Sequence, residues 1–122
     1  MRAILLVALG GGIGSALRYL TSVVVGKYFQ GNFPLATLLT NFIGCFLIGL
    51  LMGYFLKSQQ EHTELRWLLV AGFCGGYTTF SAFAYENVNL MQQSNYAVAF
   101  AYIALSVVVG LAAVWCGLLL SR

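Results

Sequence analysis

The stretch Gly72-Phe73-Cys74-Gly75-Gly76-Tyr77-Thr78-Thr79-Phe80-Ser81 decides how this chain folds, because it interrupts a long apolar segment near its middle. Three of its first five residues are glycines, each of which costs about 1 kcal/mol in a helix, and two β-branched threonines follow. At membrane depth, a broken helix persists only where its freed backbone groups face protein, an ion or water. The sequence predicts two half-helices that meet at Gly75 to Thr79, with an intact, glycine-packed helix as the alternative.

Around this stretch, the composition is that of an integral membrane protein. Of the 122 residues, 61% are hydrophobic and only 7% are charged, against about 25% charged in a soluble domain. A spanning helix needs about 20 apolar residues, and four segments qualify: 3–25, 33–56, 67–91 and 96–120. The connections between them are short and polar, so neighbouring helices run antiparallel. We therefore expect one all-α membrane domain, 1–122, with four transmembrane helices.

The positive charges favour one orientation only weakly. Arg2, Lys57, Arg66 and Arg122 fall on one side of the predicted membrane, and Lys27 falls on the other, joined by Arg18 if that side chain reaches the interface. Loops rich in Lys and Arg stay in the cytoplasm. The count favours cytoplasmic termini but leaves insertion in both orientations open.

Glycine pairs predict close contacts between the helices. Three GxxxG pairs occur, each in a different span, and this spacing lets helix backbones approach closely. The pairs are Gly10 and Gly14, Gly49 and Gly53, and Gly72 and Gly76. Four closely packed helices enclose little water, so we expect any transport function to require an oligomer.

Polar groups within the spans are candidates for function, because they are expensive in hydrocarbon. Arg18 lies two thirds of the way through the first span and either serves a site there or extends to the interface. Asn41 either bridges helices or lines a pore. Tyr102 and Ser106 share one face of the fourth span. Glu86, the sole acid within a span, lies near its end, where it would reach only the headgroup boundary.

Two phenylalanines follow the predicted break. Phe80 and Phe83 are three residues apart and project to a similar face. Ring edges carry the positive part of the aromatic quadrupole, so this pair is suited to contact an anion. Aromatic pairs in membrane helices are more often core or lipid-facing, and that alternative stays open.

Other classes of function are poorly supported. Cys45, Cys74 and Cys116 have no CxxC spacing, and His62 has no partner at metal-ligand spacing, so neither a disulfide framework nor a zinc site is expected. No Ser/His/Asp set or paired carboxylates point to an enzyme. The net charge of +3 is too small and scattered for nucleic-acid binding.

Three motifs in order resemble those of the Fluc (CrcB) family of small fluoride channels. Residues 10–19, Gly-Gly-Gly-Ile-Gly-Ser-Ala-Leu-Arg-Tyr, resemble the family's GGxxGAxxRY signature. Residues 33–46 resemble its second-helix pattern, including Asn41 and a GxF sequence. Residues 72–83 resemble its GxxGGxTTFSTF break. The resemblance covers essentially the whole chain.

The resemblance implies a passive fluoride channel in the inner (plasma) membrane. Its members are antiparallel, dual-topology homodimers with two pores and a central structural sodium ion. Carried over by position, Gly75 and Thr78 would offer backbone carbonyls to the sodium ion, and Arg18 would line the approach to a pore. The implied fluoride-pore residues are Phe80, Phe83, Asn41, Tyr102, Ser106 and Ser81. Fluoride, sodium, membrane lipid and a second copy of the chain would be the partners.

Two positions depart from the family pattern. The usual threonine of FSTF is Ala82, which removes a hydroxyl near the rings. Gly110 stands where some members carry a serine, so the far end of the polar face that carries Tyr102 and Ser106 is in doubt.

Two other functions compete with the channel. A small proton-coupled multidrug exporter has the same size, but it relies on a glutamate in the first span, where this chain has no acid. A membrane assembly subunit would use the glycine faces only to dock a partner and would not need the break.

Overall fold

The computed structural model describes residues 1–58 and 61–121, and within these residues every regular element is a helix. Three long helices, α1 (Arg2–Tyr28), α2 (Leu35–Lys57) and α6 (Tyr96–Ser121), accompany a composite segment, Thr63–Gln92. These four segments are long and apolar enough to cross a membrane, which confirms the predicted fold class. Arg122, counted in the charge bias, lies outside the described residues.

The third span is built from four short pieces. It begins with α3 (Thr63–Leu65) and a π-helix, η1 (Arg66–Cys74), continues through α4 (Gly75–Tyr77), and resumes after residues 78–80 as α5 (Ser81–Gln92). Thr78 is extended, with φ −83° and ψ 159°. The predicted break is therefore present, but Gly75 and Gly76 are still helical and the interruption begins at Thr78.

Gly72 and Gly76 of the third span serve close packing against α1 instead of breaking the helix. A methyl group on Gly76 would overlap the backbone of Gly11. In the reverse direction, a methyl group on Gly10 or Gly14 would overlap the carbonyl oxygen of Leu68 or Phe73. The two backbones therefore touch, as the GxxxG pairs predicted.

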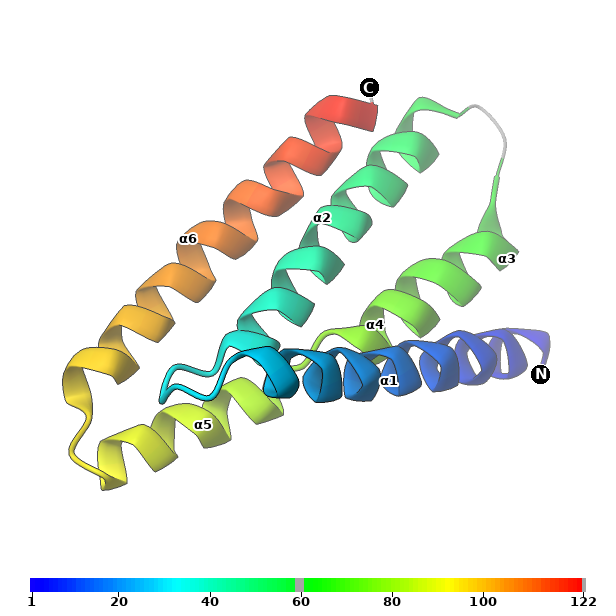
Figure 1. Cartoon of the computed structure of the whole chain (residues 1–122). Helices are drawn as coiled ribbons and strands as arrows, with labels where there is room; N and C mark the ends of the chain where they lie inside the picture. Colours follow the sequence, from blue (N-terminus) through cyan, green and yellow to red (C-terminus); the bar gives the residue numbers. More distant parts are fainter. Residues whose placement is uncertain (59–60, 122) are drawn as a thin grey trace.

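A second close contact joins α2 to α6. In Figure 1 these two helices run side by side, while α1 crosses beside α3 and α4. A side chain on Gly49 would overlap the Val114 carbonyl oxygen, and one on Gly117 would overlap the Phe46 carbonyl oxygen. Glycines again allow backbone contact. The subunit thus consists of two tightly packed helix pairs, with α5 extending from the break toward the start of α6.

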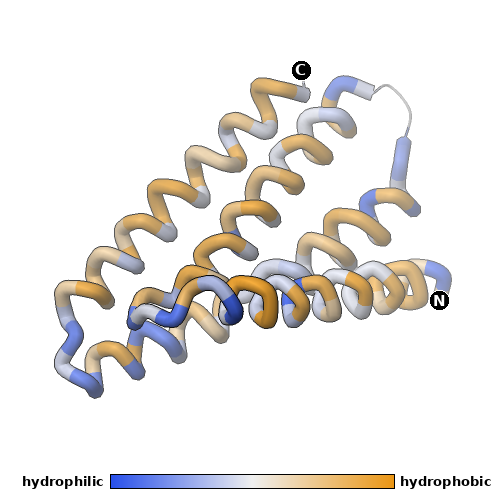
Figure 2. Tube along the Cα trace, in the orientation of Figure 1, coloured by the Kyte–Doolittle hydropathy of each residue, from blue (hydrophilic) through white to orange (hydrophobic). Residues whose placement is uncertain are grey.

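Most large apolar side chains point outward. Leu5, Val108, Leu111 and Trp115 are each about two thirds exposed, whereas the buried apolar cluster centres on Leu90, Ala99 and Tyr102. The hydrophilic colouring in Figure 2 gathers at the loops and helix ends, and the helix middles are apolar. Such continuous apolar surface marks contact with lipid or another protein. The chain is a multi-pass membrane protein.

Candidate functional site

Thr78 ends the first half of the broken span. Its backbone amide and its hydroxyl both donate to the Cys74 carbonyl oxygen, at 3.0 Å and 2.8 Å. Its methyl group fills the space beside Gly44 of α2, where any side chain would overlap it. The last helical turn is closed at Thr78, and the chain becomes extended there.

Asn41 holds the next residue of the link. Its Nδ2 donates to the Thr79 carbonyl oxygen at 3.0 Å, and its Oδ1 accepts from the Thr79 amide at 2.8 Å. In a continuous α-helix the Thr79 amide would donate to the Gly75 carbonyl oxygen. Asn41 therefore replaces helical hydrogen bonds that the break gives up, and it leaves Gly75 without that donor. Of the two roles that the sequence left open for Asn41, the structure shows the helix bridge.

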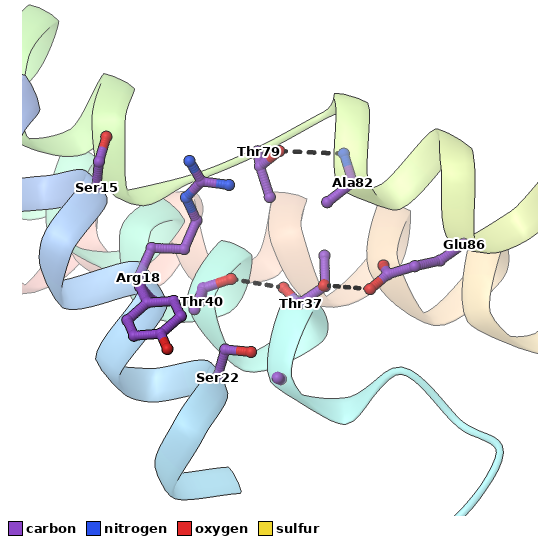
Figure 3. A pocket seen from close by; sticks show the side chains of 10 residues that line it. Ser15, Arg18, Ser22, Thr37, Thr40, Thr79, Ala82 and Glu86 are labelled. Carbon is purple, nitrogen blue, oxygen red and sulfur yellow. Dashed lines mark hydrogen bonds between the residues drawn. The ribbon is translucent and has the colours of Figure 1, made fainter. Parts of the chain in front are cut away.

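Arg18 binds another carbonyl close to the break. Its Nε donates to the Gly76 carbonyl oxygen at 3.2 Å, and the Ser15 hydroxyl donates to the same oxygen at 3.4 Å. Figure 3 shows the Arg18 guanidinium pointing toward the link between α4 and α5. A backbone carbonyl of the third span thus holds the Arg18 side chain within the subunit.

A polar pocket of about 340 Å³ opens beside Arg18, and we call it the vestibule. Hydroxyl groups from α1, α2 and the link face it, with Arg18 and Glu86 on opposite sides in Figure 3. Its lining residues are Ser15, Arg18, Tyr19, Ser22, Ala36, Thr37, Thr40, Thr79, Ala82 and Glu86. The vestibule contains one cationic group, one carboxylate and several hydroxyls, of which those of Ser15, Thr37 and Thr40 already donate within the subunit.

Glu86 makes hydrogen bonds inside the bundle, which its position near the end of the span did not indicate. One carboxylate oxygen, Oε2, accepts from the Thr37 hydroxyl at 2.7 Å, and Oε1 accepts from the Tyr102 hydroxyl at 2.9 Å. Helices α2, α5 and α6 therefore meet at this carboxylate. The available signal was that Glu86 is the sole acid within a span, because such a group needs partners.

The two phenylalanines begin a chain of ring contacts. The ring centroids of Phe80 and Phe83 lie 5.7 Å apart, and Phe83 meets Tyr102 edge-on at 5.1 Å. Tyr102 is fully buried, whereas Phe80 is 78% exposed. Phe80 thus carries the aromatic chain out to the surface of the subunit, where a partner or lipid meets it.

The two predicted serines have different environments. The Ser81 hydroxyl lies 3.3 Å from the Thr79 hydroxyl, which also accepts from the Ala82 amide at 3.2 Å and so caps the start of α5. The Ser106 hydroxyl is buried and has no hydrogen-bond partner among residues 1–58 and 61–121. Buried hydroxyls are usually paired, so Ser106 has a donor to spare.

The structure brings the sequence-predicted residues into two groups. Asn41 and Ser81 both contact Thr79 at the link, and Phe80, Phe83 and Tyr102 form the ring chain. In the described residues, Ser106 makes no hydrogen bond to either group. A methyl group added to Gly110 would lie 3.6 Å from Cys45 Sγ, so this face of α6 is turned toward α2.

These features together define a class of protein. A helix interrupted inside the membrane, with carbonyls released beside a polar pocket, is the arrangement by which small transport proteins form ion sites. The chain is of this class, a membrane-embedded transport subunit.

Comparison with known proteins gives the family. The sequence model described as CrcB-like protein, Camphor Resistance (CrcB), matches residues 5–118. A Flavobacterium psychrophilum protein named "Fluoride-specific ion channel FluC" is 52% identical over 122 residues, which cover 100% of this chain and 98% of that protein. A protein of the same name from Azobacteroides pseudotrichonymphae is 40% identical over the same shares of the two chains. Another, from Solibacter usitatus, is 43% identical over 97% of each. The chain belongs to the CrcB-like family, which confirms the resemblance seen in its motifs.

Proposed function

We propose that this chain is the subunit of a fluoride-selective channel through which fluoride leaves the cell passively across the inner membrane. The observation that carries the proposal is full-length similarity, at 52% identity, to a protein named as a fluoride-specific ion channel. The vestibule supports it, because its lining can receive a small anion from water. On this proposal the protein is a channel and not an enzyme.

The donor chemistry around the break fits fluoride. This anion is small and strongly hydrated, so a filter must replace its water with several donors at close range and still let the ion leave. The buried Ser106 hydroxyl, which has no partner among the described residues, the second N–H of the Asn41 amide and aromatic ring edges supply such donors without a net charge. Arg18 adds a positive charge that draws anions in, and its bond to the Gly76 carbonyl keeps it in place.

The pores would form between two antiparallel copies. Phe80 and Gly75 are exposed on one subunit, beside the break, so a second copy seated there would cover both. The residues proposed to line each fluoride path are Phe80, Phe83, Asn41, Tyr102, Ser106 and Ser81. The Tyr102 hydroxyl donates a hydrogen bond to Glu86, so Tyr102 would present its ring edge to the ion.

The proposed central sodium ion fits the backbone chemistry of the break. A cation is held by carbonyl oxygens that have a lone pair to spare, and the Gly75 carbonyl does not receive the Thr79 amide, which donates to Asn41. The carbonyls of Gly75 and Thr78 from both copies would hold the ion. When bound, it would neutralise these oxygens and join the two breaks, a structural role.

The test is fluoride efflux from liposomes that contain the purified protein, followed with a fluoride electrode. We expect rapid fluoride efflux with little chloride efflux. Equal fluxes of the two halides would contradict a fluoride-selective filter. Absence of any flux would instead favour an assembly subunit.

A proton-coupled exporter is the second candidate, and Glu86 is the observation that favours it. This carboxylate is held between two hydroxyls inside the bundle, a setting suited to a coupling group. Glu86→Gln preserves the shape, and both hydroxyl partners can rotate to bond an amide. A coupled exporter would lose transport in this variant, whereas we expect the channel to keep conducting. Measurement at alkaline pH avoids leakage of undissociated hydrogen fluoride through the lipid.

A further inference from the structure

A second polar pocket lies on the other side of Glu86. Its volume is about 230 Å³, and we call it the amide pocket because three carboxamide side chains line it. Its lining residues are Asn32, Pro34, Glu86, Asn89, Leu90 and Gln93. Glu86 also lines the vestibule, so this one side chain belongs to the walls of both pockets.

The spacing of residues on α5 explains why the pockets lie end to end. Glu86, Asn89 and Gln93 follow at i, i+3 and i+7, which places them on one face of the helix. Ala82, one turn before Glu86, continues the same face into the vestibule. On α2 the order is parallel: Thr37 lines the vestibule, and Pro34, near the start of that helix, lines the amide pocket.

The amide pocket lies at the end of the bundle where polar residues precede α2 and follow α5. Asn32 belongs to the connection before α2, and Gln93 follows the end of α5. Figure 2 shows hydrophilic colouring both at this connection and at the end of α5. Asn89 and Gln93 are exposed. The pocket has room for several water molecules at about 30 Å³ each, with polar groups to bind them.

The lining favours an ion in transit over a tightly held one. Among the described residues, no Lys or Arg lines the pocket, and each carboxamide offers two N–H donors. The Glu86 oxygens accept hydrogen bonds from the Thr37 and Tyr102 hydroxyls, and a carboxylate in the wall repels an anion and does not hold it. A hydrated anion can therefore exchange water for amide donors here without meeting a charge that would trap it.

We propose that the amide pocket is an aqueous mouth of the fluoride path, in which hydrated fluoride is received or released past Glu86. This inference rests on the proposed fluoride conduction. It assigns Asn32, Asn89 and Gln93 to the binding of fluoride and its water at the membrane surface. The fluoride path would then open to water at two places on the same side of the subunit, the vestibule and the amide pocket.

The first test is a thiol block at Asn89. Asn89→Cys and the control Gln92→Cys, an exposed neighbour that does not line the pocket, are modified in detergent with a bulky thiol reagent. In detergent, before reconstitution, the reagent can reach the pocket of each of the two copies. Mass spectrometry then measures the labelled fraction of each protein. We expect both introduced thiols to be labelled and only the Asn89→Cys protein to lose fluoride efflux, to the rate of protein-free liposomes. Wild-type protein treated in the same way shows how labelling of the native cysteines, Cys45, Cys74 and Cys116, affects fluoride efflux.

The outcomes separate this inference from the proposed function. A labelled Asn89→Cys protein that conducts like the labelled Gln92→Cys protein would overturn the mouth. Failure of the thiol introduced by Asn89→Cys to react would overturn it as well, because a mouth must be open to water. If untreated wild type shows no fluoride flux, the proposed function fails instead.

A charge series at the same position fixes the sign of the ion. With fluoride in the pocket, Asn89→Asp should lower efflux more than Asn89→Lys does, because a negative charge repels the ion, and the difference should shrink in high salt because surface charges are screened. The same pair at Gln92 should show a weaker difference. The opposite order at Asn89 would identify a cation pocket and overturn the proposal.

Discussion

The side-chain amide of Asn41 and the backbone of Thr79 form a closed pair of hydrogen bonds across the interrupted span. Asn41 Nδ2 donates to the Thr79 carbonyl oxygen at 3.0 Å, and the Thr79 amide donates to Asn41 Oδ1 at 2.8 Å. A single side chain thus satisfies both backbone groups of one residue at the break. Because unpaired backbone groups are costly in hydrocarbon, this pair stabilises the interruption itself.

Replacement of Asn41 should therefore reduce conduction for two reasons. The backbone at the break loses its hydrogen-bond partner, and the pore loses an N–H donor. Asn41→Asp keeps an acceptor for the Thr79 amide but loses the donor to the Thr79 carbonyl oxygen. Leaving one buried group unpaired costs about 1–3 kcal/mol, so fluoride efflux should fall roughly tenfold or more as the break rearranges. Asn95→Asp, in the turn before α6, is the matched control and should conduct normally. Equal efflux from the two variants would contradict a structural role for Asn41.

The glycine contacts predict a sharp contrast within α1. A methyl group on Gly14 would overlap the Phe73 carbonyl oxygen, whereas Gly12 has no atom within 4 Å of such a group. Gly14→Ala should therefore lower the thermal stability of the purified protein in detergent. Gly12→Ala should leave it unchanged or raise it slightly, because alanine favours a helix by about 1 kcal/mol over glycine. Equal melting temperatures for the two variants would show that α1 and the third span do not touch as described.

The spans and glycine contacts were predictable from sequence because they depend on local composition. Apolar length determines the four spans, and the GxxxG spacing places small residues on one face of a helix. The position of the break was predicted slightly too early, at Gly75. Helix propensity penalises glycine, but packing against Gly11 favours a small residue at Gly76 and keeps that turn helical. Tertiary contact outweighed local propensity.

The hydrogen bonds of the site were less predictable because they join distant segments. Arg18 and Gly76 are 58 residues apart, and Thr37 and Glu86 are 49 apart. Nothing in the local pattern of either partner indicates the other. Asn41 was expected to need a partner in hydrocarbon, but the sequence did not show that this partner is the backbone of Thr79.

Arg18 combines a charge with a backbone hydrogen bond, and substitutions can separate the two. Arg18→Lys keeps the charge but loses the Nε donor to Gly76, and Arg18→Ala loses both. Electrostatic attraction is screened by salt, with a Debye length of about 10 Å at 0.1 M. Efflux should therefore fall as salt rises in wild type and in Arg18→Lys, and it should be low and nearly independent of salt in Arg18→Ala. The same salt dependence in all three proteins would show that Arg18 does not attract the ion.

Phe80 provides the test of the aromatic chain, because it alone of the three rings is largely exposed on the single subunit. Phe80→Ile keeps an apolar side chain of similar bulk but removes the positive ring edge. Tyr85→Ile is the matched control, since Tyr85 is also exposed on α5, at 71%, and lies outside the ring contacts described. If ring edges contact fluoride, Phe80→Ile should lose most of the fluoride efflux while both variants elute from a sizing column like wild type. Loss of efflux in both variants alike would point to lipid-facing packing instead. If Phe80→Ile dissociated into single subunits, the role of Phe80 would lie in holding two copies together and not in binding the ion.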